Sequence, residues 1–346
     1  MTAAFAAARA VIQRGIETRA FPAAAVSVGG RSGPAWTEAF GRLTYADDAP
    51  PCLPATIFDL ASLTKVVATA SLAMAQIGAG SLTLGGAVSA LLPEWAGDER
   101  RAITLRHLLD HSSGLPSRVP GWQLTSGRTG FRELLASTVL ERPPGASAVY
   151  SDVGFMVLGL LLEESGAPMD RQFGAIFGDR LDPIRFGPLA DVRGVAPTEF
   201  DPWRGRVLVG EVHDENAAAL GGVAGHAGLF GTAESVGAFA RLVLQTFDEP
   251  TALGSPDLMR EFAKKSAVPG SSRGLAWDTA LAASSCGRFM SPGAIGHTGF
   301  TGTSLWIDEA QDVYAVLLTN RVHPTRTNDQ LIPLRRAFHE ALLGPG

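Results

Sequence analysis

The segment FDLASLTKVVATA, residues 58–70, contains the only lysine of a long apolar stretch. From residue 60 to residue 93 no other side chain is ionisable. Burying an unpaired ammonium is costly, so Lys65 needs either a partner or a function. At about 100° per residue, a helix over this segment puts the apolar side chains on one stripe and places Ser62 and Lys65 one turn apart on a neighbouring strip.

A serine and a lysine one turn apart suit nucleophilic catalysis. A serine hydroxyl is a weak nucleophile until a base removes its proton, and a desolvated lysine can have its pKa lowered enough to be that base. The start of a helix adds free N–H groups that stabilise an oxyanion. The pattern S-x-x-K is short, however. By itself it supports catalysis no more than a structural alternative, in which the lysine side chain extends from a mostly buried helix to place its ammonium in water.

The flanking sequence predicts an α+β fold whose sheet is built from both ends of the chain. An alanine-rich helix precedes two strands at residues 23–30 and 35–43, and three more strands are expected at residues 294–300, 303–308 and 313–320. A last amphipathic helix carries Leu331, Leu334 and Phe338 on one face. We therefore expect an antiparallel sheet domain from residues 1–60 and 220–346, and a mainly helical domain from residues 61–219.

Composition narrows the kind of partner. The 346 residues carry a net charge of −5 and are 46% hydrophobic, so no basic surplus attracts nucleic acid or an anionic membrane. The most apolar run, residues 153–162, is too short to span a bilayer and predicts a buried helix. The expected partner is a small ester, amide or short peptide, and the oligomeric state stays open.

The N-terminal residues and the two cysteines carry less information. Arginines and a glutamate interrupt the first 21 residues, which predicts a cytoplasmic chain, or a periplasmic or secreted one if a leader was removed. Cys52 and Cys286 lie far apart in no paired pattern, which indicates passive thiols rather than a disulfide or a zinc site. No metal and no organic cofactor are expected.

Four segments occur in the order found in the penicillin-recognising serine hydrolases. They are FDLASLTK at 58–65, ITLRHLLDHSSGLPS at 103–117, VYSDVGFMVLG at 149–159 and GHTGFTGTSLWID at 296–308. The chain resembles the branch that contains class C β-lactamases, DD-peptidases and β-lactamase-like esterases. This resemblance covers most of the sequence and implies a β-lactamase/DD-peptidase-like fold with the active site between its two parts.

The resemblance also implies a role for each matching residue. Ser62 would be the nucleophile that forms an acyl-enzyme, and Lys65 its proton partner. Tyr150 would share the general base duty and protonate the leaving group. The backbone N–H groups of Ser62 and Phe300 would form the oxyanion hole. His297, Thr298 and Gly299 stand where many members have Lys-Thr-Gly on the strand beside the substrate.

Two positions depart from that pattern. Asp152 replaces an asparagine, and a carboxylate near Lys65 favours the charged ammonium, which shifts the base role toward Tyr150. His297 replaces a lysine and is a weaker cation for a substrate carboxylate. Both changes argue against an efficient β-lactamase. We expect an esterase first, a peptidase for D-Ala-terminated peptides second and a β-lactamase third. The alternative to these enzymes is a penicillin-binding sensor or scaffold that does not turn over a substrate.

The remaining motifs are interpreted structurally. Residues 212–230 resemble a segment of a subgroup with DD-carboxypeptidases and predict a loop that borders the site. Glycines recur every third residue from 222 to 231 and predict turns and close packing. The G-x-S-x-G at 270–274 lacks the strand and helix of a nucleophile elbow. His107 and His111 lack a third ligand and are expected to support the floor of the site.

Overall fold

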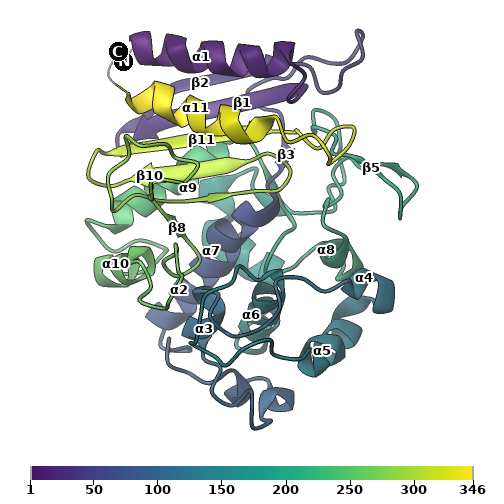
Figure 1. The fold of residues 1–346 in the computed structure, drawn as a ribbon, viewed down its shortest axis with the longest axis vertical. Helices are drawn as coiled ribbons and strands as arrows, with labels where there is room; N and C mark the ends of the chain where they lie inside the picture. The colour runs from purple at the N-terminus through teal and green to yellow at the C-terminus, as the bar shows by residue number, and fades with distance from the viewer. Residues whose placement is uncertain (1, 345–346) are drawn as a thin grey trace.

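The computed structural model describes residues 2–344 and contains a six-stranded antiparallel sheet built from both ends of the chain (Figure 1). The strand order is β2-β1-β11-β10-β9-β8. The strands are β1 (Ala23–Gly30), β2 (Gly33–Gly41), β8 (Asp278–Thr279), β9 (Ile295–Thr298), β10 (Ser304–Asp308) and β11 (Val313–Thr319). Val26 pairs with Leu317, so the first and last strands lie side by side and the predicted terminal assembly is confirmed.

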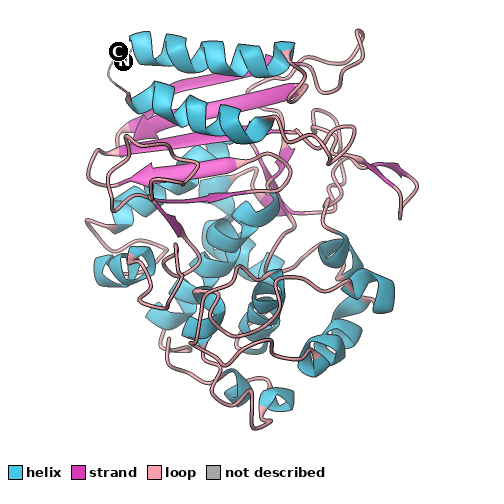
Figure 2. Ribbon diagram, in the orientation of Figure 1, coloured by secondary structure: helices cyan, strands magenta, loops and turns pink. Residues whose placement is uncertain are grey.

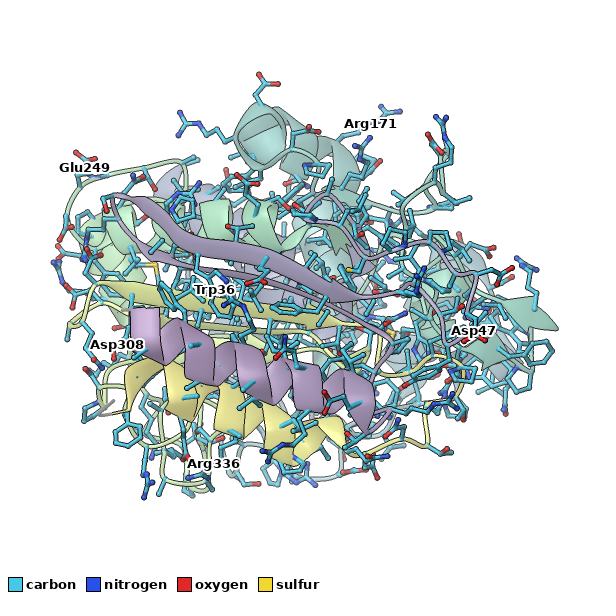
Figure 3. The ribbon with its side chains drawn as sticks, turned by 90° about the horizontal axis from the view of Figure 1, so that it is seen from above. Trp36, Asp47, Arg171, Glu249, Asp308 and Arg336 are labelled. Atoms are coloured by element: carbon cyan, nitrogen blue, oxygen red, sulfur yellow. The ribbon has the colours of Figure 1, made fainter. Side chains whose placement is uncertain are left out.

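Helices cover both faces of this sheet. The terminal helices α1 (Thr2–Glu17) and α11 (Leu331–Leu343) pack together on one face, and α9 (Ala233–Thr246) packs on the other. Side chains of β1 alternate between two cores: Ala24 and Val26 join the α1/α11 core, and Ala23 and Ala25 join the core beneath. In Figure 3, Trp36 lies between the sheet and the terminal helices, where its ring stacks on Phe5 at 5.2 Å.

The remaining part of the molecule is mainly helical and lies below the sheet in Figure 2. Its central helix, α6 (Asp152–Glu164), is buried from Asp152 through Leu162, which confirms the prediction of a buried helix. The other helices of this part are α2 (Ser71–Gly78), η3 (Val88–Ala90), η4 (Pro93–Trp95), α3 (Leu105–Leu109), α4 (Gly121–Leu124), α5 (Gly127–Ser137), α7 (Met169–Leu181) and α8 (Glu215–Ala219), whereas α10 (Pro256–Ala263) contacts α9. No helix among residues 2–344 has both the length and the apolar character to cross a membrane.

Short strands connect the two parts. Strands β3 (Phe58–Asp59), β7 (Leu229–Gly231) and β4 (Arg185–Phe186) form a small sheet, and β5 (Phe200–Asp201) pairs with β6 (Arg206–Val207) in a separate hairpin. Strand β3 leads directly into the Ser62 segment. The nucleophile candidate therefore lies at the point where the chain passes from strand to helix.

The segment after β3 is not the uniform α-helix that the sequence predicts. It begins with a 3₁₀ turn, η1 (Ala61–Leu63), continues as a π-helix, η2 (Lys65–Ala70), and becomes α-helical only in α2. The hydroxyl of Ser71 donates to the carbonyl of Val66 at 3.1 Å, and that of Thr69 to the carbonyl of Gly225 at 2.6 Å. Side-chain bonds thus support the wider turn, a form common at functional sites.

The glycines between 222 and 231 provide turns and close packing, as predicted. Gly222 and Gly228 have φ of +90° and +125°, which disfavours a side chain. A Cβ on Gly225 would lie 2.0 Å from the carbonyl oxygen of Phe155. Only glycine therefore lets this loop approach α6. Cys52 and Cys286 are buried free thiols.

Candidate active site

Three predicted residues meet at the hydroxyl of Ser62. Its Oγ accepts hydrogen bonds from Lys65 Nζ at 3.0 Å and from the Tyr150 hydroxyl at 2.9 Å. Ser62 and Lys65 come from η1 and η2, whereas Tyr150 comes from the residues just before α6. A serine contacted by an ammonium and a phenol has the groups that nucleophilic acyl transfer requires.

Lys65 is fully buried and paired with a carboxylate. Its Nζ lies 2.8 Å from Asp152 Oδ1 and donates to the carbonyl of His226 at 3.1 Å. Burial lowers the pKa of Lys65, but Asp152 and Tyr150 together outweigh burial and raise that pKa above its ordinary value. Burial raises the pKa of Asp152, but Lys65 lowers it overall. The pair is therefore ionised, as the sequence analysis predicts for these two residues.

Tyr150 is held as a protonated phenol. Burial raises its pKa, and the nearby charge of Lys65 only partly opposes this effect. The ammonium of Lys65 lies 4.9 Å from the ring centroid, and the guanidinium of Arg273 lies 4.8 Å from it. These two cations lower the cost of forming a phenolate, which is the form that acts as a base.

His111 supports this tyrosine. Its Nδ1 accepts the backbone N–H of Ser151 at 3.0 Å, and its ring lies 4.9 Å from that of Tyr150. Burial lowers the pKa of His111 well below its ordinary value, so the ring is neutral. His107 instead completes a capping box with Thr104 at the start of α3. Among residues 2–344, no cluster of three or more metal-ligating side chains is placed to hold an ion.

His297 supplies no charge to the site. It is 2% exposed, and its Nδ1 lies 2.8 Å from the carbonyl of Thr298. Burial, followed by the charges of Arg273 and Lys65, lowers the pKa of His297 well below its ordinary value. The strand position that carries a lysine in many members thus carries a neutral ring here.

The two predicted oxyanion donors are unpaired. In the described part of the chain, the backbone N–H groups of Ser62 and Phe300 have no hydrogen-bond partner. A Cβ on Gly299 would lie 2.7 Å from the carbonyl oxygen of Leu60 and 3.2 Å from Ala61 Cβ. Glycine at this position therefore brings the end of β9 against the start of η1, which places both donors beside one cleft.

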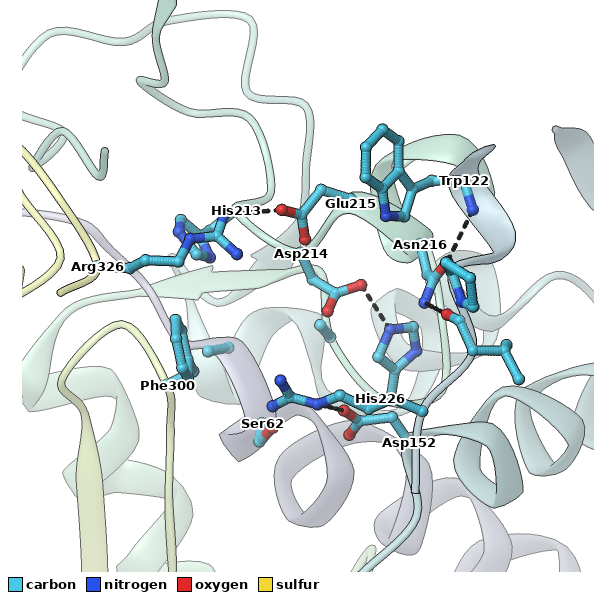
Figure 4. Close-up of a pocket in the computed structure, with 15 residues that line it drawn as sticks. Ser62, Trp122, Asp152, His213, Asp214, Glu215, Asn216, His226, Phe300 and Arg326 are labelled. Atoms are coloured by element: carbon cyan, nitrogen blue, oxygen red, sulfur yellow. Dashed lines mark hydrogen bonds and ion pairs between the residues drawn. The ribbon is translucent and has the colours of Figure 1, made fainter. Parts of the chain in front are cut away.

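The first of two cavities at Ser62 has a volume of about 390 Å³ (Figure 4). Charged side chains line it, among them Arg118, Asp152, Asp214, Glu215 and Arg326. Residues 213–216 form its far wall: Asp214 Oδ1 lies 2.7 Å from His226 Nε2, and Asn216 Oδ1 accepts the N–H of Trp122 at 2.9 Å. This segment borders the site and is hydrogen-bonded, as predicted, but residues 215–219 form helix α8 and not a loop.

The second cavity, of about 290 Å³, lies on the Tyr150 side of Ser62. His297, Thr298 and Gly299 line it together with four arginines, Arg118, Arg273, Arg321 and Arg335. Arg335 has no carboxylate partner within residues 2–344. Burial, and then the charge of Arg321, lowers the pKa of Arg335 to about 10, which leaves it cationic at neutral pH.

Sequence reasoning did not single out these arginines or Asp59, and it assigned no mechanistic role to His226. The arginines come from four separate segments, and no spacing relates them. Asp59 lies inside the Ser62 segment and was visible as its only acid. The G-x-S-x-G alternative is not supported, because residues 270–274 form a loop without a strand before or a helix after them.

The fold and the site define a serine hydrolase of the β-lactamase type. The profile of the Beta-lactamase family matches residues 8–340, and the chain belongs to this family. A Salmonella agona protein named "Putative D-alanyl-D-alanine carboxypeptidase" is 29% identical over 322 residues, which cover 80% of this chain and 72% of that protein.

Solved structures show the same fold. EstCE1, described as a hydrolase with promiscuous acyltransferase activity, superimposes with a TM-score of 0.79 at 20% identity, covering 99% of both chains. A penicillin-binding protein homologue from Caulobacter crescentus has a TM-score of 0.78 at 18% identity, covering 98% of this chain and 96% of that chain. The unliganded selenomethionyl simvastatin synthase from Aspergillus terreus has a TM-score of 0.78 at 19% identity, with 98% of each chain covered.

Proposed function

We propose that the protein hydrolyses its substrate through an acyl-enzyme on Ser62. The observation that carries this proposal is the Ser62 hydroxyl, which lies within hydrogen-bond distance of both Lys65 and Tyr150, beside two unpaired N–H donors. Family membership supports the same chemistry.

In acylation, the phenolate form of Tyr150 takes the proton from Ser62 Oγ as Oγ attacks the substrate carbonyl. The N–H groups of Ser62 and Phe300 stabilise the oxyanion. Tyr150 then gives the proton to the leaving group as the carbonyl carbon separates from it. Lys65 stays an ammonium throughout and balances the negative charge on Tyr150, because Asp152 keeps it protonated.

Hydrolysis of the acyl-enzyme repeats these steps with water as the nucleophile. The Tyr150 phenolate takes a proton from water as the water oxygen bonds to the acyl carbon. Collapse of the second oxyanion breaks the ester bond to Ser62, and Tyr150 returns the proton to Oγ. The product is the free acid, and the enzyme regains its starting protonation.

The arginine-lined cavity supports a substrate with a carboxylate on its leaving group. Tyr150 lines that cavity and protonates the leaving group, so the leaving group lies there. Arg321 and Arg335 present cations to it, and the Arg335 charge has no acid partner within residues 2–344. We propose peptides ending in D-alanyl-D-alanine, in agreement with the name of the curated relatives.

Neutral carboxylic esters are the second candidate. The neutral His297 replaces the cation that many members hold on β9, and the fold matches that of the hydrolase EstCE1. Comparing a peptide that ends in D-alanyl-D-alanine, its C-terminal amide and a methyl ester of the same acyl group separates the candidates. A preference for the free carboxylate over its amide of at least about 10-fold in kcat/KM supports the peptidase; equal turnover of the free-carboxylate peptide and its C-terminal amide excludes it.

The nucleophile is tested by intact mass after incubation with a fluorophosphonate and, separately, with a penicillin. Wild type should gain one adduct and Ser62→Ala none. An adduct that persists in Ser62→Ala and disappears in Ser272→Ala overturns the assignment and supports the G-x-S-x-G serine. A single acylation without steady turnover of any ester, β-lactam or peptide supports the sensor alternative.

A further inference from the structure

Asp59 is a buried carboxylate that the reaction above does not use. It is the last residue of β3, is 2% exposed and forms no ion pair within residues 2–344. Burial raises its pKa, although N–H bonds from His213 and Ala61 oppose this shift. A buried acid without a cation is costly, so its hydrogen bonds deserve a functional explanation.

Its first hydrogen bond acts on the residue before Ser62. Asp59 Oδ1 accepts the N–H of Ala61 at 2.8 Å, and Ala61 has a φ of +47°. This left-handed conformation costs a non-glycine residue about 1–2 kcal/mol. The side chain of Asp59 closes a local turn that favours it. The orientation of the following N–H, that of Ser62, depends on this conformation.

Its other contacts reach the second oxyanion donor. The backbone carbonyl of Asp59 accepts the hydroxyl of Thr301 at 2.8 Å, next to Phe300. Asp59 Oδ2 accepts the N–H of His213 at 2.7 Å, and the His213 ring stacks on that of Phe300 at 5.6 Å. Figure 4 shows His213, Phe300 and Ser62 around the same cavity.

We propose that Asp59 is a positioning residue for the oxyanion hole, which holds the N–H groups of Ser62 and Phe300 toward one point without touching the substrate. This inference rests on the proposed acyl-enzyme function. Because the oxyanion forms only during reaction, loss of the alignment should lower kcat and leave KM nearly unchanged.

The test variant is Asp59→Asn, which keeps the shape but turns one acceptor oxygen into an NH₂ donor that faces a backbone N–H. We expect kcat for an activated ester to fall by about 10- to 100-fold and KM to change by less than about 3-fold. The matched control is Asp308→Asn. Asp308 is equally buried at 0% exposure and accepts the N–H groups of Ser291 at 2.6 Å and Gln311 at 3.2 Å, at the far end of β10.

Rescue by glycine separates positioning from loss of stability. Glycine adopts a positive φ without the penalty of alanine. We therefore compare two factors: the fall in kcat from wild type to Asp59→Asn, and the fall from Ala61→Gly to the double variant Asp59→Asn/Ala61→Gly. The second factor should be at least about 5-fold smaller than the first. An equal loss in both backgrounds, or an equal loss of kcat in Asp308→Asn, overturns the proposal.

If Asp59→Asn does not fold, Thr301→Val tests the same arrangement, because it removes only the hydroxyl that binds the Asp59 carbonyl. It should lower kcat by at least about 3-fold with KM unchanged, and an unchanged kcat overturns the proposal. Fluorophosphonate labelling distinguishes a failure of the proposed acyl-enzyme function from a failure of the positioning role alone. No adduct on Ser62 in wild type means that the proposed function fails. Equal labelling rates in wild type and Asp59→Asn mean that only the positioning role fails.

Discussion

Within residues 2–344, Asp152 is the only carboxylate that contacts the Lys65 ammonium, and replacing it by asparagine removes that contact. The side chains of Lys65 and Asp152 are 0% and 9% exposed, and the two charges lie 2.8 Å apart. Breaking a buried pair by removing one partner costs about 3–5 kcal/mol, because the remaining charge stays buried without compensation. We expect Asp152→Asn to lower the free energy of unfolding by this amount near pH 7, measured by urea denaturation.

The pH dependence of this loss follows from the pKa directions. In wild type the raised pKa of Lys65 stabilises the fold fully below the ordinary lysine value, and this contribution is lost as pH rises through the folded value. The lowered pKa of Asp152 stabilises the fold above the ordinary carboxyl value and is lost as pH falls through the folded value. In Asp152→Asn, only Tyr150 still opposes burial, which is the largest influence on Lys65. The pKa of Lys65 should therefore fall, and the variant should recover stability from about pH 7 to pH 9.

The double variant Lys65→Met/Asp152→Asn is the control. It leaves no unpaired buried charge, because the other partner of Asp152, Arg118, is 66% exposed, so it should regain most of the free energy of unfolding lost by Asp152→Asn. A loss below about 1 kcal/mol in Asp152→Asn, equal at both pH values, would refute the buried ion pair.

Asp152→Asn should also raise the acylation rate by a chromogenic cephalosporin, followed by stopped flow; an unchanged or lower rate contradicts the electrostatic role of this carboxylate. Because burial raises the pKa of Tyr150 and its phenolate is the base, kcat/KM for a neutral ester should rise from pH 6 to pH 9. Tyr150→Phe should be about 10²- to 10⁴-fold slower and should lack this rise. Arg335→Met should lower kcat/KM for a D-alanyl-D-alanine peptide by about 10-fold and for its methyl ester by less than 2-fold, and equal losses contradict carboxylate recognition. Gly225→Ala should lower the free energy of unfolding, measured by chemical denaturation, by about 1–3 kcal/mol or more, because the new Cβ meets the Phe155 carbonyl. The control Gly174→Ala in α7 places its Cβ where nothing lies within 4 Å and should raise that free energy by about 0.5–1 kcal/mol.

The sequence predicted much of this architecture because the relevant patterns are local. The short strand at residues 23–30 and the amphipathic face of α11 follow from which side chains must be buried. The apolar run of α6 likewise predicted a helix enclosed on every side. The π-helical turn at Lys65–Ala70 was missed, because it depends on the bond from Thr69 to Gly225, a partner 156 residues away.

By itself, the sequence determined that Ser62 and Lys65 meet, because residues three apart lie on the same side of a helix. It also determined that Asp152 lies two residues after Tyr150, at the start of a buried helix. Only the tertiary structure decided that Lys65 is charged, because its pKa depends on how the Ser62 segment packs against α6. The same holds for the arginine cavity and for the contacts of Asp59 with His213 and Thr301, which join segments 154 and 242 residues apart. Packing of the whole core creates such contacts, and no local period in a sequence specifies them.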